Sequence, residues 1–388
     1  MAAYSDLAET FAQAAQRHGA LVAVQTVVAV ANTTANAFSM IYLLREGLSY
    51  AECAFFLLIA FVVALVLATL GSNLVARNFS ASMRLGMVAM AAYYIALAAL
   101  PGWALMYVPP LLLGTYIVMF WVPYNSLISH ATSREMRGAG IGAYFLVFPA
   151  VSVVGPLAGG LIITLGSYDL LFAFGAAVIG VNILFLSKPS AVKVDRTLTA
   201  EGILSPTRRR VFSLARTDKR VARGLFAQGV QDGVFWMALP VLSFEFATDE
   251  AALGGYLSLF AFCGALMTVA LGYLSDRVRE RGRILRMSAA LTMIFIVVCG
   301  LAGSAEGYLT GMSATNFGLA VIAAFLFTLL VDRSENAVTA GMMAREAMLN
   351  AGRLVGISVT LMLLVLDFDL SISMFVAAAA TATVIAVK

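Results

Sequence analysis

Residues 223–246 have the sequence RGLFAQGVQDGVFWMALPVLSFEF, a mostly apolar segment with a carboxylate, Asp232, near its middle and a second, Glu245, close to its end. A segment of this length can cross the hydrocarbon core of a bilayer, which takes about 20 residues of α-helix. A carboxylate at that depth is costly unless it is paired, protonated or hydrated, so such residues usually mark the path of an ion, a proton or a substrate. The alternative is a protonated Asp that only hydrogen-bonds neighbouring helices. The segment predicts a membrane helix and makes Asp232 the first candidate functional residue.

The rest of the chain has the composition of a membrane protein. Hydrophobic residues make up 61% of its 388 residues and charged residues only 12%, whereas soluble domains carry about 25% charge. The pattern predicts an all-α polytopic membrane protein with twelve transmembrane helices. The predicted helices cover residues 21–44, 51–75, 85–100, 103–128, 139–165, 168–186, 223–246, 251–274, 287–305, 309–331, 348–366 and 370–387.

The distribution of charge predicts the orientation. All of the 25 Lys and Arg residues except Arg45 fall on one side of the predicted helices. The positive-inside rule makes that side cytoplasmic. We therefore expect a protein of the cell (inner) membrane with both termini in the cytoplasm. The net charge of +4 then follows from topology, and we expect no nucleic-acid partner. The opposite side carries acids: Glu46, Asp169, Glu245, Asp249, Glu250, Glu306, Asp367 and Asp369.

Polar segments divide the chain. Residues 1–19 lack the pattern of a signal peptide and predict a short cytoplasmic amphipathic segment. Residues 188–222 predict a basic cytoplasmic linker between two six-helix bundles, 20–187 and 223–388. The linker could bind anionic lipid, although the charge rule alone explains its arginines. The two halves echo each other: Asn125 with Arg134-Glu135 matches Asn336 with Arg345-Glu346, each expected at the cytoplasmic turn after the fourth helix of its half.

Three motifs resemble those of a known family. Residues 272–277, GYLSDR, with Arg279, Arg281, Gly282 and Arg283, resemble the G-x-L-x-D-R-x-G-R-R turn of the major facilitator superfamily. The counterpart at residues 71–84 keeps Gly71, Arg77 and Arg84 but has no acid. Residues 155–160, GPLAGG, resemble the G-P-x-x-G-G segment, but Val151 replaces the preceding glycine expected of proton–drug antiporters. The chain therefore resembles this superfamily of transporters over almost its whole length, and a drug exporter is disfavoured.

The resemblance implies that the first, fourth, seventh and tenth helices line a central cavity. The polar residues of this chain concentrate on those helices. Gln228, Asp232 and Trp236 recur every four residues and so share one helical face. Aromatic residues at such spacing more often pack than bind. The candidate substrate- or ion-binding residues are Asp232, Gln228, Gln231, Trp236, Asn32, Thr33, Asn36, Gln25, Tyr124, Asn125 and Trp121.

Candidate gating residues lie elsewhere. Asp276 and Arg277 resemble the family's cytoplasmic latch, and a fixed surface ion pair is the alternative. Arg353, inside the predicted eleventh helix, needs a partner, and Asp332 or Glu335 could pair with it as a gate or as a structural ion pair. No Arg or Lys lies at the midplane of the predicted cavity helices, so an inorganic anion is not expected as substrate.

No pattern of residues predicts an enzyme. The chain has two histidines, His18 and His130, and neither an H-E-x-x-H nor a G-x-x-x-x-G-K-[ST] motif. Cys53, Cys263 and Cys299 lie in predicted apolar helices, so neither a disulfide framework nor a metal cluster is expected. We expect no cofactor, with a proton gradient as the energy source.

These observations lead to one expectation and several alternatives. We expect a secondary active transporter of a small polar or amphipathic organic solute, working by alternating access, coupled to protons through Asp232, and monomeric in the lipid bilayer. The alternatives are a proton-independent facilitator, a lipid flippase, and a membrane sensor or assembly factor that does not transport.

Overall fold

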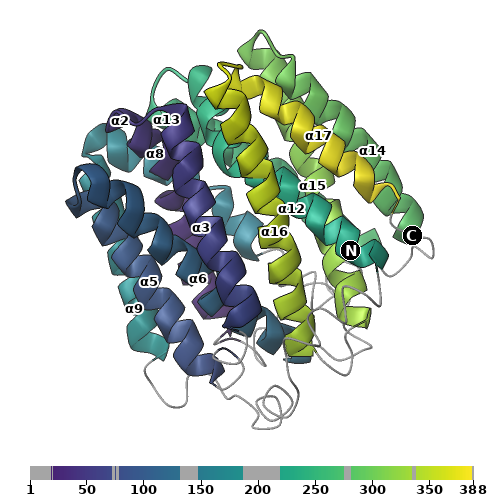
Figure 1. Ribbon diagram of the computed structural model, residues 1–388, viewed down its shortest axis with the longest axis horizontal. Helices are drawn as coiled ribbons and strands as arrows, with labels where there is room; N and C mark the ends of the chain where they lie inside the picture. Colours follow the sequence, from purple (N-terminus) through teal and green to yellow (C-terminus); the bar gives the residue numbers. More distant parts are fainter. Residues whose placement is uncertain are drawn as a thin grey trace, which may run out of the picture.

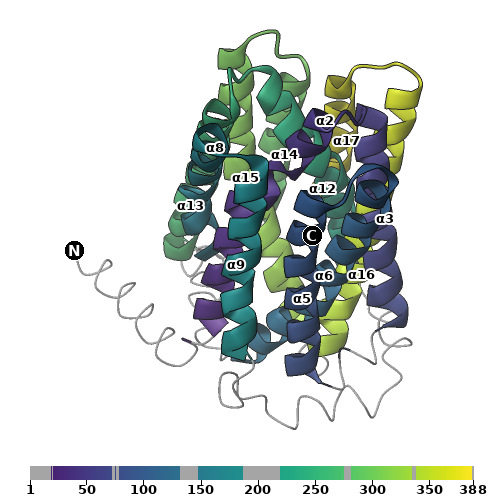
Figure 2. The ribbon, with the colours of Figure 1, turned by 90° about the vertical axis from the view of Figure 1, so that its left-hand side faces the viewer.

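The protein is a helical bundle in which helices run side by side between two ends (Figures 1 and 2). The computed structural model describes residue 19 and residues 21–71, 75, 78–131, 147–186, 219–274, 281–333 and 338–386. Within these ranges the structure has twelve α-helices and no strand, which confirms the fold class predicted from the sequence. Ten helical segments are long and apolar enough to span a membrane. The others are α12, with its polar residues, and the shorter segment Leu370–Val384.

The described part of the first half contains six helical segments. They are Leu21–Arg45, which includes η1 (Asn36–Phe38) and α2 (Ser39–Arg45); α3 (Tyr50–Leu70); α5 (Phe79–Ala99); α6 (Gly102–Ala131); Val147–Leu165, which includes α8 (Gly155–Leu165); and α9 (Tyr168–Leu186).

The second half repeats this order. Its helices are α12 (Lys219–Glu245), α13 (Glu250–Leu274), α14 (Arg281–Gly300), α15 (Ala305–Arg333), α16 (Val338–Val365) and α17 (Ser373–Val384), the last preceded by η2 (Leu370–Ile372).

Corresponding helices of the two halves pack in the same way. In the first half α5 packs against α6 and α9, and α6 also packs against α3. In the second half α14 packs against α15 and α17, and α15 also packs against α13. The halves meet mainly along two pairs of helices, α3 with α16 and α8 with α13, and α6 also contacts α16. This matching pattern is the arrangement expected of an internal repeat.

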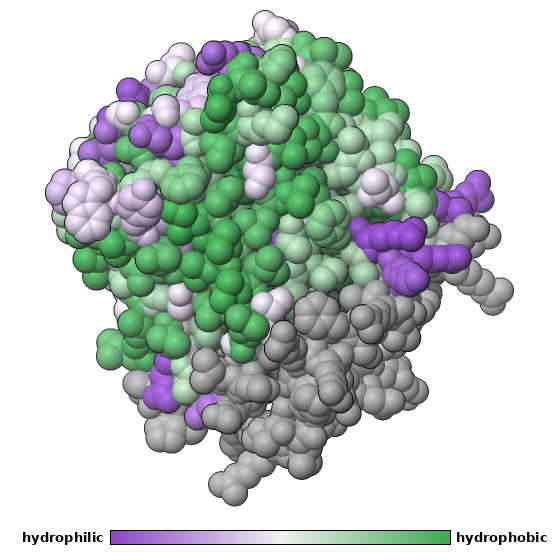
Figure 3. All heavy atoms as spheres, viewed as in Figure 1, coloured by the Kyte–Doolittle hydropathy of each residue, from purple (hydrophilic) through white to green (hydrophobic). Residues whose placement is uncertain are grey.

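The two ends of the bundle differ in the sign of their charged residues. We call the end with Glu46, Glu245 and Glu250 the acidic end; it is uppermost in Figures 1 and 2, where α2 lies. The opposite end, where α12 and α14 begin with Lys219, Arg220, Arg281 and Arg283, is the basic end. On the face shown in Figure 3, the described surface between the ends is mostly apolar. Exposed side chains there include Val62, Val66, Val355 and Met362 on α3 and α16, which suits contact with lipid.

Two helices of the first half are interrupted. The first helix turns at Ala35 and continues as the 3₁₀ segment η1 before α2. Its sequence NTTANAFS is rich in Asn, Thr and Ser, whose side chains compete for backbone hydrogen bonds. The fifth helix is broken by a turn at Val153 and Val154, just before Pro156, because proline lacks an N–H and crowds the preceding turn.

Glycines allow the halves to approach closely. A Cβ atom at Gly254 of α13 would collide with the backbone carbonyl of Pro156, and one at Gly160 of α8 would collide with that of Glu250. Gly160 of the GPLAGG segment therefore allows close helix packing at this interface between the halves.

Several helices begin earlier than predicted. At the basic end α5 begins at Phe79, α14 at Arg281 and α16 at Val338, whereas apolarity alone put their starts at 85, 287 and 348. Polar and charged residues extend these helices beyond the most apolar stretch, since long cationic side chains can reach water from a helix end. The N-terminal segment 1–18 and residues 188–218 of the linker lie outside the described residues.

Candidate functional site: a cavity between the two halves

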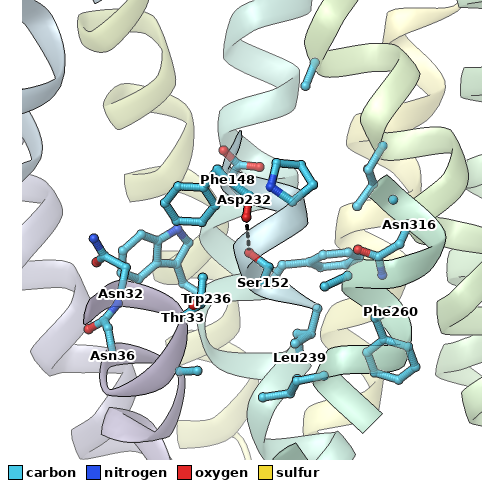
Figure 4. A pocket seen from close by; sticks show the side chains of 18 of the residues that line it. Asn32, Thr33, Asn36, Phe148, Ser152, Asp232, Trp236, Leu239, Phe260 and Asn316 are labelled. Carbon is cyan, nitrogen blue, oxygen red and sulfur yellow. Dashed lines mark hydrogen bonds between the residues drawn. The ribbon is translucent and has the colours of Figure 1, made fainter. Parts of the chain in front are cut away.

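A cavity of about 740 Å³ lies between the two halves, a volume typical of sites for small organic molecules. Residues from both halves line it (Figure 4). In that view Asn32 and Asn36 of the first half lie on one side, and Asn316 and Phe260 of the second half lie opposite them.

Amide groups form the polar wall of the first half. Asn32 Nδ2 donates a hydrogen bond to Tyr116 Oη at 2.7 Å and another to the Val28 carbonyl at 3.0 Å. Asn36 Oδ1 accepts a hydrogen bond from Tyr93 Oη at 3.0 Å. Asn36 belongs to η1, so the interruption of the first helix lies at the cavity. The interruption therefore places a polar side chain from a 3₁₀ segment in the cavity wall.

An ion pair forms part of the second half's wall. Arg353 Nη2 of α16 lies 3.3 Å from Asp232 Oδ2 of α12. The Arg353 side chain is 13% exposed and that of Asp232 is 25% exposed, so both are largely withdrawn from water while Asp232 still faces the cavity. The two helices come close because Gly233 has no Cβ atom to collide with the Arg353 backbone.

The ion pair continues into a chain of charged groups along α16. Arg345 Nη1 lies 2.6 Å from Glu346 Oε1, and Arg353 Nη1 lies 4.0 Å from Glu346 Oε2. Asn350 is one turn from each: its Oδ1 accepts from Arg353 Nη1 at 3.1 Å and its Nδ2 donates to the Glu346 carbonyl at 2.8 Å. Glu346 and Asn350 are buried, so their charge and dipoles are compensated within the helix.

Aromatic rings connect this cluster to the first half. The Arg353 guanidinium lies 5.8 Å from the centre of the Phe61 ring, which belongs to α3. Phe61 also packs edge-on against Trp236 of α12, with ring centres 5.6 Å apart. A displacement of Arg353 would therefore change the packing at the α3–α16 interface between the halves.

The cavity brings together most of the predicted binding residues. Nine of them line it: Gln25, Asn32, Thr33, Asn36, Trp121, Asn125, Gln231, Asp232 and Trp236. Gln228 and Tyr124 are not among the lining residues. Tyr124 lies behind the wall, where its Oη donates to the Leu21 carbonyl at 3.0 Å and to Gln25 Oε1 at 3.1 Å. Gln228 lies one turn from Asp232, toward the basic end of α12.

Predictions for the gating residues meet a mixed outcome. We expected Arg353 to pair with Asp332 or Glu335, but the structure pairs it with Asp232 across α12 and α16. Asp332 lies in α15 with an undescribed side chain, and Asp276, Arg277 and Glu335 lie outside the described residues.

Arg345 and Glu346 lie deeper than predicted. The repeat placed them in a cytoplasmic turn, whereas they lie about two turns inside α16 and line the cavity. Their mutual ion pair makes this position tolerable. The prediction that no Arg or Lys lies at the midplane concerned the first, fourth, seventh and tenth helices. The structure shows that the eleventh helix, α16, contributes Arg345 and Arg353 to the cavity wall. The spacing of Glu346, Asn350 and Arg353, three and four residues apart, was the signal in the sequence for this polar face.

Comparison with known proteins agrees with this architecture. A family model for the Major Facilitator Superfamily matches residues 21–356. No functionally curated protein matches the chain in sequence.

Solved structures of transporters share the fold at low sequence identity. FucP in the outward conformation has a TM-score of 0.67 with 12% identity, covering 95% of this chain and 96% of FucP. A POT family transporter in complex with 5-aminolevulinic acid has a TM-score of 0.68 with 11% identity, and the match covers 95% of this chain and 94% of that transporter. The human organic anion transporter MFSD10 (TETRAN) has a TM-score of 0.66 with 14% identity, and the match covers 95% of this chain and 99% of MFSD10.

The described residues form twelve helices in two matching halves, with a cavity between them whose largely apolar wall carries several polar and charged side chains. This arrangement defines a multi-pass membrane protein with a transporter fold. The chain belongs to the major facilitator superfamily. Its family and fold point to membrane transport and away from catalysis.

Proposed function

We propose that this protein is a secondary active transporter that moves a small organic solute by alternating access and couples its movement to protons through Asp232. One observation carries the proposal: the Asp232–Arg353 ion pair lies in the wall of a cavity shared by both halves. A carboxylate paired there can be neutralised by a proton, which releases the guanidinium for a new interaction. Such a two-state contact can bias a conformational equilibrium.

The position of Arg353 supports coupling between protonation and movement of the halves. Its guanidinium contacts Phe61 of α3, so the ion pair of the second half is in contact with the first half. Loss of the Asp232 charge would leave Arg353 incompletely compensated in a largely buried position, which is unfavourable. The side chain would then reorient, and the α3–α16 interface would have to adjust.

The closed acidic end supports alternating access. Arg45 Nη2 of the first half lies 3.0 Å from Glu250 Oε1 of the second, and Tyr168 Oη donates to the same oxygen at 3.1 Å. The cavity extends toward the basic end as far as Gln25, Asn125 and Arg345. If the basic end is cytoplasmic, as its arginines predict, this is an arrangement in which the outer side is closed.

The test begins with the identification of a ligand. The purified protein would be screened against metabolites and drugs for an increase in melting temperature, since a ligand that prefers the folded state stabilises it. The labelled ligand would then be offered to proteoliposomes with and without a proton gradient, using wild type, Asp232→Asn and the matched control Asp169→Asn. Asp169 is exposed in the first turn of α9 and lies outside the cavity.

We expect Asp232→Asn to lose gradient-driven accumulation while ligand binding and exchange persist, and Asp169→Asn to behave as wild type. Accumulation by Asp232→Asn with wild-type pH dependence would exclude proton coupling through this residue. Wild-type flux that ignores the proton gradient would favour a facilitator. Ligand binding without any flux would favour a sensor, and flux of labelled lipid alone would favour a flippase.

A further inference from the structure

We propose that the cavity takes an organic anion, whose charged group replaces Asp232 on the guanidinium of Arg353 when Asp232 is protonated. This inference rests on the proposed proton-coupled transport and names the substrate class of the same site. Its consequence is that one proton enters the cavity with each monovalent anion.

The charge balance of the cavity is the first argument. Among the described residues that line it, the charged ones are Asp232, Glu346, Arg345 and Arg353, two of each sign. Protonation of Asp232 leaves one positive charge without compensation, and a buried unpaired charge is strongly unfavourable. An entering anion restores neutrality, whereas an entering cation adds to the imbalance.

The second argument is the hydrogen bonding of Arg353. Asp232 engages only Nη2, at 3.3 Å, and Asn350 engages Nη1. Arg353 Nε is buried without a hydrogen-bond partner in the described part of the chain. A planar guanidinium can donate from Nε and Nη2 together to two oxygens of one carboxylate or sulfonate. A ligand with such a group would use a donor that Asp232 leaves unused.

The third argument concerns ligands of the opposite charge. Asp232 and Glu346, the carboxylates of the cavity wall, are each already paired with an arginine. A cationic ligand would therefore have to displace a guanidinium from a largely buried position. The remaining wall offers rings to the body of the ligand, including Trp121, Phe148, Trp236 and Phe260. An anionic group attached to an aromatic or aliphatic body matches this lining.

The pH dependence follows from these contacts. The charged groups facing Asp232 from α16 are Arg353, Arg345 and Glu346. The helices α2, α3, α13, α15 and α17 also lie near α12, and none contributes a charged residue to the described cavity lining. Helix α6 contributes the titratable Tyr116 to that lining. Acidic buffer protonates Asp232 and frees Arg353, so anion affinity should rise as pH falls and decline as pH rises.

Ligands that differ only in charge can test the proposal. The probes are benzenesulfonate, benzoate, benzamide and benzylamine, with their naphthalene counterparts, measured by thermal shift and tryptophan fluorescence on the full-length protein. The sulfonates stay anionic in both acidic and neutral buffer, so their pH dependence reports the protein. We expect the sulfonates to bind more tightly in acidic buffer, and the amides and amines to bind weakly or not at all.

Three variants sharpen the test. Arg353→Gln should weaken sulfonate binding at least roughly tenfold, because it removes a direct charge partner. Arg286→Gln, an exposed residue of α14 outside the cavity lining, should bind as wild type. Asp232→Asn should bind sulfonate in neutral buffer as tightly as wild type does in acidic buffer, and its affinity should no longer depend on pH. Misfolding cannot produce this gain.

Three results would each overturn the proposal: preferential binding of the amines, no binding by any anion of the set, or sulfonate affinity that is equal in both buffers for wild type. These outcomes are separate from failure of the transport proposal. Proton-driven flux of a cationic or neutral solute would leave transport standing and remove the anion, whereas anion binding without flux would do the reverse.

Discussion

Asp232 and Arg353 illustrate how far single residues can be interpreted. A lone carboxylate in an apolar segment signals function because its burial is costly. The same reasoning required a partner for Arg353, and the acids expected near the cytoplasmic face, Asp332 and Glu335, were the suggested partners. The structure instead joins residues 121 positions apart. The cost of a buried charge is a property of one residue, while its partner depends on which helices lie side by side.

Gly233 is one of the glycines that allow these two helices to approach closely. In Gly233→Ala the new methyl group would press on the Arg353 backbone, and we expect a loss of about 1–3 kcal/mol in stability, as for other overpacked sites. Gly180→Ala is the matched control, because a Cβ atom there meets nothing within 4 Å. It should be neutral or stabilising by up to about 1 kcal/mol. Melting temperatures of the purified variants measure both effects, and equal temperatures would show that α12 and α16 can separate at little cost.

At the scale of helices, the notable elements are those that combine an apolar surface with a polar inner face. The outer face of α16 has exposed Val355 and Met362, while its inner face carries Glu346, Asn350 and Arg353. Apolarity alone therefore placed the start of this helix ten residues too late. A helix can cross the bilayer without being uniformly apolar if its charged residues are paired and face the inside of the bundle.

The acidic end is closed by contacts between elements of opposite halves. Glu250 in the first turn of α13 accepts from Arg45 and Tyr168, and Glu245 accepts from Tyr50 at 3.2 Å. We expect Glu250→Gln to weaken this closure and increase the fraction of molecules open at the acidic end. The Arg45 side chain is 55% exposed, so the effect should be modest, up to about 1 kcal/mol.

Cysteine labelling can measure this change. With Cys53, Cys263 and Cys299 replaced, a single cysteine at the cavity residue Leu239 would report access of an impermeant maleimide from the acidic end. Glu306→Gln is the control, since Glu306 is exposed in the first turn of α15 at the same end. If both variants label at the same rate, the Glu250 contacts do not hold the end closed.

Two adjacent glycines give a second test of the same interface. Gly254→Ala should force α13 away from Pro156 of α8, whereas a Cβ atom at Gly255 meets nothing within 4 Å. We expect Gly254→Ala to increase labelling at the Leu239 position and Gly255→Ala to leave it unchanged. Identical behaviour of the two variants would argue against tight α8–α13 contact in the dominant state of the protein.

At the scale of the whole molecule, the two halves and their orientation are separate questions. The packing of the two halves is seen in their matching helix pairs. Which end of the bundle faces the cytoplasm is inferred from charge alone. Single cysteines in place of Ser190 and Asp249 test it. We expect the residue 249 position to react with impermeant reagent added outside intact cells and the residue 190 position to be protected. Labelling at 190 from outside would reverse the proposed topology.

The sequence by itself determined the twelve helices, their division into halves and nine of the cavity residues. These features depend on local apolarity, charge asymmetry and helical periodicity, all of which are written along the chain. Only the tertiary structure decided that Arg353 pairs with Asp232, that Arg345 and Glu346 face the cavity, and that Arg45 meets Glu250. Each of these contacts joins separate helices, or depends on which face of a helix turns inward. Helix packing sets both, because close approach at residues such as Gly233 and Gly254 fixes which side chains can meet.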